Sequence, residues 1–176
     1  VLEGKQTLTA DNNKESMRYA AHVIADKVYE LITGIPGDFS GRIAYIEEIG
    51  TGKEKISRLK VMDADGENAK TITEVAGSIF SPTWSPDGNR IAYSVQRDKS
   101  HPVIYIQNVS GGGATPLTPF PGSNLSPSFS PDGSKILFSS SFEGSADIYE
   151  MSASGGQPRR LTNWPSSEVQ PSYAPD

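Results

Sequence analysis

The chain has 176 residues, a formal net charge of −5 and no cysteine. The acidic balance and the lack of a basic stretch argue against a nucleic-acid partner. The missing cysteines exclude disulfides, thiol catalysis and thiolate metal sites, and no apolar run is long enough to span a bilayer. With 17 glycines and 13 prolines, the composition predicts many short strands and tight turns rather than a helical bundle.

The N-terminal segment carries a helical pattern. Residues 1–9 alternate between apolar and polar side chains, which predicts a weak strand. Asn12 and Glu15 have the spacing of a capping box, and the apolar periodicity that follows predicts an amphipathic helix of about 20 residues that ends at Gly34. Because one strand cannot cover the apolar stripe of this helix, we expect residues 1–38 to be the C-terminal strand and helix of a truncated α/β domain.

An eight-residue motif recurs through the rest of the chain. Residues 81–88 and 126–133 read Ser-Pro-x-aromatic-Ser-Pro-Asp-Gly, and residues 170–176 begin a third copy. The period of about 45 residues is typical of a repeat architecture. After a linker at 39–41, residues 42–176 are therefore expected to form about three repeats.

Each repeat is expected to hold four short strands, named first to fourth in chain order. The short connections predict antiparallel neighbours, and one such sheet in about every 44 to 48 residues is typical of a β-propeller blade. We therefore predict an all-β fold of propeller blades, with a β-solenoid as the competing architecture. First strands are expected at 83–85, 128–130 and 172–174, second strands at 42–48, 90–96 and 135–141, third strands at 57–63, 102–108 and 146–152, and fourth strands at 69–74, 114–118 and 158–162.

The Ser-Pro-Asp-Gly segment is expected to turn the chain between the first and second strands. Proline presets φ, aspartate accepts a hydrogen bond from the backbone downstream, and glycine takes a positive φ. The aromatic residue before it (Trp84, Phe129 or Tyr173) is expected to pack between adjacent blades. An aromatic platform for a ligand is the alternative.

These motifs resemble the repeats of the TolB family. The resemblance rests on the octapeptide, the basic-apolar run after it, Asp147-Ile148-Tyr149 and Gly155-Gly156. Residues 18–39 make it more specific, because they resemble the segment that closes the N-terminal domain of that family. Similar repeats occur in the propellers of prolyl-oligopeptidase-like peptidases and in surface-layer proteins. The resemblance covers essentially the whole chain and implies about three of the six blades of a periplasmic protein from a Gram-negative bacterium.

The resemblance also implies a function. It predicts a non-enzymatic protein-binding scaffold of the Tol–Pal system, whose propeller face binds the peptidoglycan-associated lipoprotein Pal and supports outer-membrane integrity and constriction during cell division. Other Tol proteins are implied as partners through parts absent here. The alternatives are the propeller gating domain of a prolyl-oligopeptidase-like peptidase that lacks its catalytic domain, and a propeller that binds a sugar or metal in its channel. About three blades leave unpaired edges, which tend to associate. We therefore expect either that the chain is a fragment of a longer protein or that two copies of the chain meet to complete a ring.

The residues themselves predict no catalytic, cofactor or metal site. There is no Gly-x-Ser-x-Gly motif, His22 is expected to pack or lie at the surface of the helix, and His101 is expected in a solvated loop. Residues 63–74 begin like a calcium-binding loop, but Glu67 stands at a ligand position where Asp or Asn is needed and no flanking helices are predicted. A hairpin turn is therefore expected there.

Antiparallel strands place two kinds of connection on opposite rims. One rim carries the uniform Pro-Asp-Gly and Gly-Gly turns, and the other carries residues 75–81, 96–101, 119–126 and 163–170, which we call the loop rim. Because these loops vary among the repeats, they are expected to host function, with a solvated role as the alternative. The resemblance places Pal binding on Ser123, Ser126 and Val169, with an extension to Phe80 and Ser81. The apolar loop residues are expected to form the centre of the interface: Phe80, Leu125, Trp164 and Val169. The full set of partner-binding candidates is Phe80, Ser81, Ser123, Leu125, Ser126, Trp164 and Val169.

Overall fold

The computed structural model describes residues 8–174, and the chain divides into two compact units. Among these residues, the smaller unit holds 8–43 together with Val61–Lys70, and the larger unit holds Ala44–Lys60 and 71–174. The strand predicted at residues 1–9 lies mostly outside the described residues, and Leu8 and Thr9 belong to no strand.

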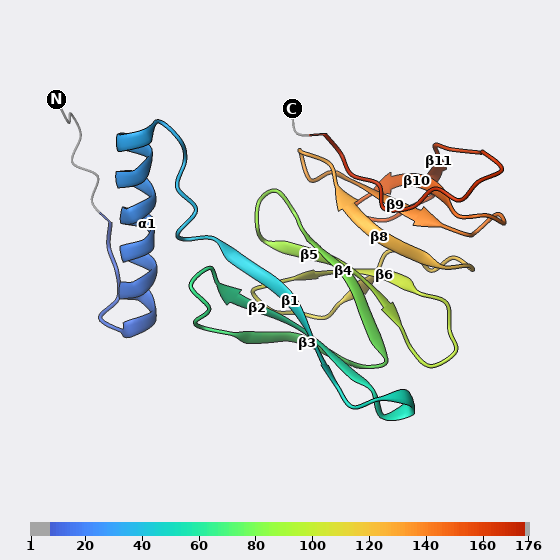
Figure 1. The fold of residues 1–176 in the computed structure, drawn as a ribbon, viewed down its shortest axis with the longest axis horizontal. Helices are drawn as coiled ribbons and strands as arrows, with labels where there is room; N and C mark the ends of the chain where they lie inside the picture. The colour runs from blue at the N-terminus through green and yellow to red at the C-terminus, as the bar shows by residue number, and fades with distance from the viewer. Residues whose placement is uncertain (1–7, 175–176) are drawn as a thin grey trace. The chain divides into compact units, whose positions relative to one another are not determined.

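The smaller unit is built on one helix, α1 (Lys14–Thr33), whose 20 residues match the predicted length (Figure 1). Its N-cap is Asn13, whose side-chain oxygen accepts a hydrogen bond from the Ser16 N–H at 2.8 Å. The predicted cap at Asn12 is therefore wrong. The N-cap side chain needs one partner, the backbone N–H of the third helical residue, which here is Ser16. The glutamate of the predicted capping box is therefore not required. Gly34 ends the helix in the left-handed conformation with φ of 73°, as predicted.

A hairpin turn at residues 63–66 contacts this helix within the smaller unit. Asp65 at the tip pairs with Arg18, and its Oδ2 lies 2.9 Å from Nε2 of His22. The Arg18 guanidinium and then the Glu67 N–H hold the pKa of Asp65 down at about 2. The predicted turn is confirmed, and His22 takes part in a contact that fixes the helix to the turn.

Three sheets follow the helix, and each corresponds to one repeat (Figure 1). The strands lie side by side in chain order, and the pairs of the second and third sheets are antiparallel, as predicted. A short 3-10 helix, Gly52–Glu54, lies between the first two strands, and residues 172–174 form no strand, so that prediction is wrong. The sheets consist of β1 (Arg42–Ile49), β2 (Ile56–Asp63) and β3 (Lys70–Ala76); β4 (Ser78–Trp84), β5 (Arg90–Gln96), β6 (Val103–Asn108) and β7 (Thr115–Pro116); and β8 (Asn124–Phe129), β9 (Lys135–Ser140), β10 (Asp147–Ser152) and β11 (Arg159–Arg160).

Strands β4 and β8 begin four to five residues earlier than the sequence predicted. The prediction starts each strand after the first Ser-Pro of the motif, whose proline cannot donate to a sheet ladder. Instead, β4 has a bulge between Phe80 and Thr83, and β8 has one between Leu125 and Ser128. Each bulge leaves the proline of its motif copy unpaired in the ladder. Phe80 and Leu125 are therefore strand residues and not loop residues, which corrects the expected extent of the loop rim.

The Ser-Pro-Asp-Gly turn has the predicted geometry in both complete copies. In the third sheet, Asp132 accepts hydrogen bonds from the Ser134 N–H at 2.9 Å and from the Ser130 hydroxyl at 2.6 Å. The Ser130 hydroxyl also accepts from the Lys135 N–H at 2.9 Å, which closes the turn. Gly133 has a φ of 69°, in the left-handed region that only glycine enters without strain. The hydrogen bonds that close the turn are thus local, and the Arg90 guanidinium of the second sheet also donates to the Gly133 carbonyl at 3.1 Å.

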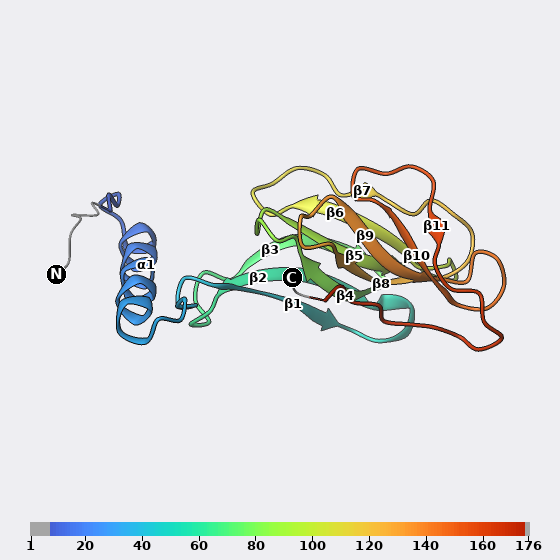
Figure 2. The same ribbon diagram turned by 90° about the horizontal axis from the view of Figure 1, so that it is seen from above.

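The second and third sheets pack against each other around one apolar cluster (Figure 2). Ala92 and Ile104 of the second sheet meet Phe129 and Phe138 of the third. Phe129 is the aromatic residue of the second motif copy and is only 7% exposed, which confirms its predicted place between blades. The Arg90 guanidinium lies over its ring at 5.4 Å from the centroid.

A polar contact links the first and second sheets. The Gln107 side-chain amide on β6 donates to the Ile72 carbonyl on β3 at 3.2 Å. The same side chain accepts from the Tyr93 hydroxyl at 2.8 Å, and burial raises the pKa of Tyr93 to about 12. Because every one of these buried groups has a partner, the contact fixes the spacing of the two sheets.

Candidate functional site

The register of the sheets places the connections of the loop rim at one end of each blade. Ser78 at the start of β4 pairs with Gln96 at the end of β5. Asn124 at the start of β8 pairs with Ser140 at the end of β9. The connection before each first strand therefore lies beside the loop that follows the second strand, as the sequence predicted.

A buried asparagine fixes the connection between the second and third blades. Asn124 is fully buried, and its Oδ1 accepts from the Ser140 hydroxyl at 2.8 Å. Its Nδ2 lies between 3.0 and 3.3 Å from three carbonyl oxygens, those of Pro102, Phe120 and Gly122. Because the amide holds both ends of residues 120–124, the loop presents a fixed surface.

Three of the predicted partner-binding residues occupy equivalent places in the three repeats. Phe80, Leu125 and Val169 each stand directly before a residue with a positive φ, and these three residues have φ values of 49°, 53° and 57°. Strand β8 lies against β4, so Phe80 and Leu125 are on neighbouring strands. Val169 is 59% exposed and lies in a segment that forms no strand. The repeat thus brings an apolar side chain to the same backbone position each time.

The remaining predicted residues have different environments. Ser81 is exposed and Ser126 half-buried, and both hold the left-handed conformation at the bulge. Ser123 exchanges two hydrogen bonds with Ser141: its N–H donates to the Ser141 hydroxyl at 2.9 Å, and its carbonyl accepts from the Ser141 N–H at 3.1 Å. Trp164 is 62% exposed in a segment without regular structure. The role of all seven residues in partner binding stays a prediction.

A cavity of about 810 Å³ lies on the loop rim between the first and second blades, and the sequence did not predict it. It is lined by the loop after β1, by Gly77 and by the loop after β5. Lys53, Lys55 and Lys99 contribute to its wall. Each lysine alone is an ordinary loop residue in the sequence, so only the meeting of two loops from different repeats reveals the cluster.

The equivalent place between the second and third blades is occupied by aromatic rings. Phe120 lies in the connection before β8, and Phe142 lies in the loop after β9. Their ring centroids are 5.8 Å apart with a tilted geometry, and Phe120 also packs against the apolar cluster. The loop rim therefore carries two chemically different junctions.

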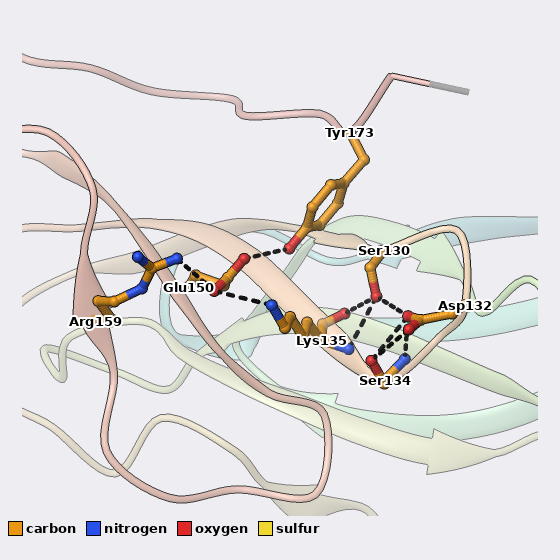
Figure 3. Close-up of polar contacts among 7 residues, drawn as sticks. All are labelled: Ser130, Asp132, Ser134, Lys135, Glu150, Arg159 and Tyr173. Carbon is orange, nitrogen blue, oxygen red and sulfur yellow. Dashed lines mark hydrogen bonds and ion pairs between the residues drawn. The ribbon is translucent and has the colours of Figure 1, made fainter. Parts of the chain in front are cut away.

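A separate polar network at the third sheet has a structural role (Figure 3). Tyr173, the aromatic residue of the third motif copy, donates to the Glu150 carboxylate at 3.0 Å. Burial and then the bond to Glu150 raise the pKa of Tyr173 to about 12. The ion pair with Arg159 is the main reason why the pKa of Glu150 is lowered. This network holds the start of the next repeat against β10 and lies apart from the loop rim.

The structure offers no clear site for metal-assisted chemistry among residues 8–174. No group of three or more His, Asp or Glu side chains in this range is arranged to hold a metal ion. His101 is exposed in the loop after β5, as expected. Within the same range, no helix combines the length and the apolar character that a membrane span needs.

Known proteins share this repeat and this arrangement of blades. The family model described as the TolB beta propeller domain matches residues 29–176. The Tol-Pal system protein TolB of Hahella chejuensis is 46% identical over 95 residues, which cover 54% of this chain and 22% of that protein.

Two solved structures extend the similarity to three dimensions. The crystal structure of TolB from Acinetobacter baumannii is 42% identical with a TM-score of 0.76, and the match covers 89% of this chain and 38% of that chain. The structure of a putative TolB from Agrobacterium tumefaciens is 28% identical with a TM-score of 0.62, and the match covers 74% of this chain and 45% of that chain. This chain therefore spans less than half the length of the relatives that it matches. Because the family model covers most of the sequence, the chain belongs to the TolB β-propeller family.

Proposed function

We propose that this chain is part of a non-enzymatic, periplasmic scaffold of the Tol–Pal system that binds the lipoprotein Pal through its loop rim. In this role it supports outer-membrane integrity and constriction during cell division. Support comes from the family membership and from relatives that carry the name Tol-Pal system protein TolB. Other Tol proteins are proposed as partners through parts of the protein outside this chain.

The observation that carries the proposal is a backbone position that recurs in three repeats. Phe80, Leu125 and Val169 stand at the same position before a left-handed residue in three successive repeats. Each apolar side chain is followed by a polar residue, Ser81, Ser126 or Gln170. Apolar residues beside polar ones match the anatomy of a protein interface, with an apolar centre and a polar border. Scaffold turns on the other rim are uniform and tight, and they offer no such arrangement.

The family membership favours this function over the peptidase alternative. A gating propeller of a peptidase shares the blade architecture, but the helix α1 and the family match from residue 29 onward follow the TolB pattern. We further propose that residues 1–38 belong to a separate N-terminal domain, that 39–41 form a linker and that 42–176 form the partial propeller. Pairing of two copies through open blade edges stays a prediction, which a mass measurement in solution decides.

A titration of the chain with purified Pal tests the proposed interface. Leu125→Ala and Val169→Ala should each weaken the affinity about 10-fold, because each removes an apolar side chain from the expected centre, while the melting temperature stays near that of the parent. Val109→Ala, in the turn after β6 on the opposite rim, is a matched control that should leave the affinity unchanged. Unchanged affinity in both rim variants would contradict the proposal.

A further inference from the structure

The cavity between the first two blades has an unusual charge for this protein. The chain carries a formal net charge of −5, yet three lysines, Lys53, Lys55 and Lys99, line one cavity together with a single acid, Asp98. Lys55 forms an ion pair with Glu48 at 2.6 Å. Across residues 8–174, Lys53 and Lys99 form no ion pair within 4.0 Å. Two ammonium groups are thus available to an anionic ligand, in a concave setting that strengthens their field.

The walls of this cavity are held in place by backbone contacts. The Gly77 N–H donates to the Lys55 carbonyl at 2.9 Å, which ties the connection before β4 to the end of the first loop. A Cβ on Gly77 would lie 2.2 Å from the Gln96 carbonyl oxygen, so the two backbone segments approach more closely than any residue other than glycine would allow. On the other side, the Gln96 side-chain amide donates to the Ser100 carbonyl at 3.1 Å and closes the loop that carries Lys99. The lysines therefore extend from a preorganised frame.

The size of the cavity indicates the kind of ligand. A volume of about 810 Å³ lies in the range of about 300 to 1,000 Å³ typical of sites that enclose a drug-sized molecule. A single inorganic anion would leave most of it empty. Besides lysines, the lining offers the Ser78 hydroxyl and the Gln96 side-chain oxygen, which are groups that can bond a peptide main chain.

We propose that this cavity binds an acidic peptide segment, with carboxylates of the segment at Lys53 and Lys99 and its backbone along Gly77 and Ser78. The inference rests on the proposed function in one respect, namely that the loop rim faces a protein partner. It adds the chemistry of that partner: a segment with at least two carboxylates enters between the first and second blades. At the next junction, the corresponding loops carry the aromatic pair Phe120–Phe142 in place of lysines.

A peptide titration followed by NMR tests the proposal without Pal. The ¹⁵N-labelled chain is titrated with a hexaglutamate peptide, acetylated and amidated at its ends, and with the equivalent hexaglutamine peptide as the uncharged probe. The amides of Gly52, Gly77 and Ser78 should shift with the glutamate peptide only, and the affinity should fall about 10-fold or more between low salt and about 0.5 M salt because screening acts on exposed charges. The double variant Lys53→Gln/Lys99→Gln should reduce the affinity at least about 10-fold, to the level of the glutamine peptide.

The control is the double variant Lys14→Gln/Lys135→Gln, which has the same net charge as the test variant but leaves the cavity intact. It should bind the glutamate peptide as the parent does. Equal losses in both double variants, or shifts spread over the whole surface, would show that only net charge matters and would overturn the proposal. If the peptide binds at the cavity while Pal does not bind the chain, the proposed function fails and the acidic-peptide site stands. If Pal binds and the peptide does not, the cavity proposal alone fails.

Discussion

The junction between the first and second blades differs from the junction between the second and third, although both follow from the same repeat. At the first, the Gln107 side chain bonds the two sheets, and the loop rim opens into a cavity lined by lysines. At the second, an apolar cluster joins the sheets, and Phe120 and Phe142 occupy the rim. The comparison shows that the repeat determines the backbone path, while a few loop side chains determine what each junction can bind.

Both junctions share one backbone device, a glycine that touches the next blade. Gly77 approaches the Gln96 carbonyl, and Gly122 approaches Ser141, where an added Cβ would lie 2.8 Å from the carbonyl carbon. Both glycines have positive φ values, of 133° and 83°. Because this contact places two successive loops side by side, it creates the space that the lysines or the aromatic rings then line.

The largest expected effect comes from this shared contact. Gly77→Ala and Gly122→Ala should each lower the free energy of unfolding by about 3 kcal/mol, from backbone strain together with a clash against the next loop. Gly112→Ala is a matched control, since its φ of 98° is also positive but no atom lies within 4 Å of an added Cβ. It should cost about 1 kcal/mol from strain alone. Urea denaturation measures the free energy of unfolding of all three variants. Equal losses in the three would contradict the claim that Gly77 and Gly122 are held by close contact with the next loop.

Substitutions at the two junctions should differ in how much they lower the free energy of unfolding, by less than the glycine variants do. Phe120→Ala should lower the free energy of unfolding by about 2 kcal/mol, because Phe120 packs against the apolar cluster, and the exposed Phe142→Ala should lower it by about 1 kcal/mol. Lys53→Ala and Lys99→Ala at the first junction should change it by less than about 0.5 kcal/mol, as is usual for exposed charges. The same denaturation experiment compares them. A lysine variant as destabilised as Phe120→Ala would mean that the first junction is structural.

The smallest effect is a pH dependence of the turn that both complete repeats share. The Ser130 hydroxyl and the Ser134 N–H lower the pKa of Asp132 to about 2, below its ordinary value. A lowered pKa in the folded state adds stability that is complete above the unfolded pKa and is lost as the pH falls toward 2. The difference in Tm between the parent and Asp132→Asn should therefore be constant above about pH 5 and shrink between about pH 4 and 2. Thermal melts across this range measure it, and a difference independent of pH would show that the carboxylate charge does not stabilise the turn.

The sequence predicted the repeat, the antiparallel order and the turn at Asp132 because each depends on local residue chemistry or on a fixed period. It missed the bulges because serine before proline normally avoids the left-handed conformation that Ser81 and Ser126 adopt. Paired strand residues on both sides hold these two serines in place, which is a tertiary effect. The lysine cavity was also missed, since it forms only when loops more than 40 residues apart meet, as Lys53 and Lys99 do.

The central claim is that the loop rim faces the protein partner. Hydrogen–deuterium exchange of the chain with and without saturating Pal tests it directly. Bound Pal should slow exchange in residues 75–81, 119–126 and 163–170, while the turns at 86–88 and 131–133 on the opposite rim keep their exchange rates. Protection of those turns, with no change on the loop rim, would contradict the account.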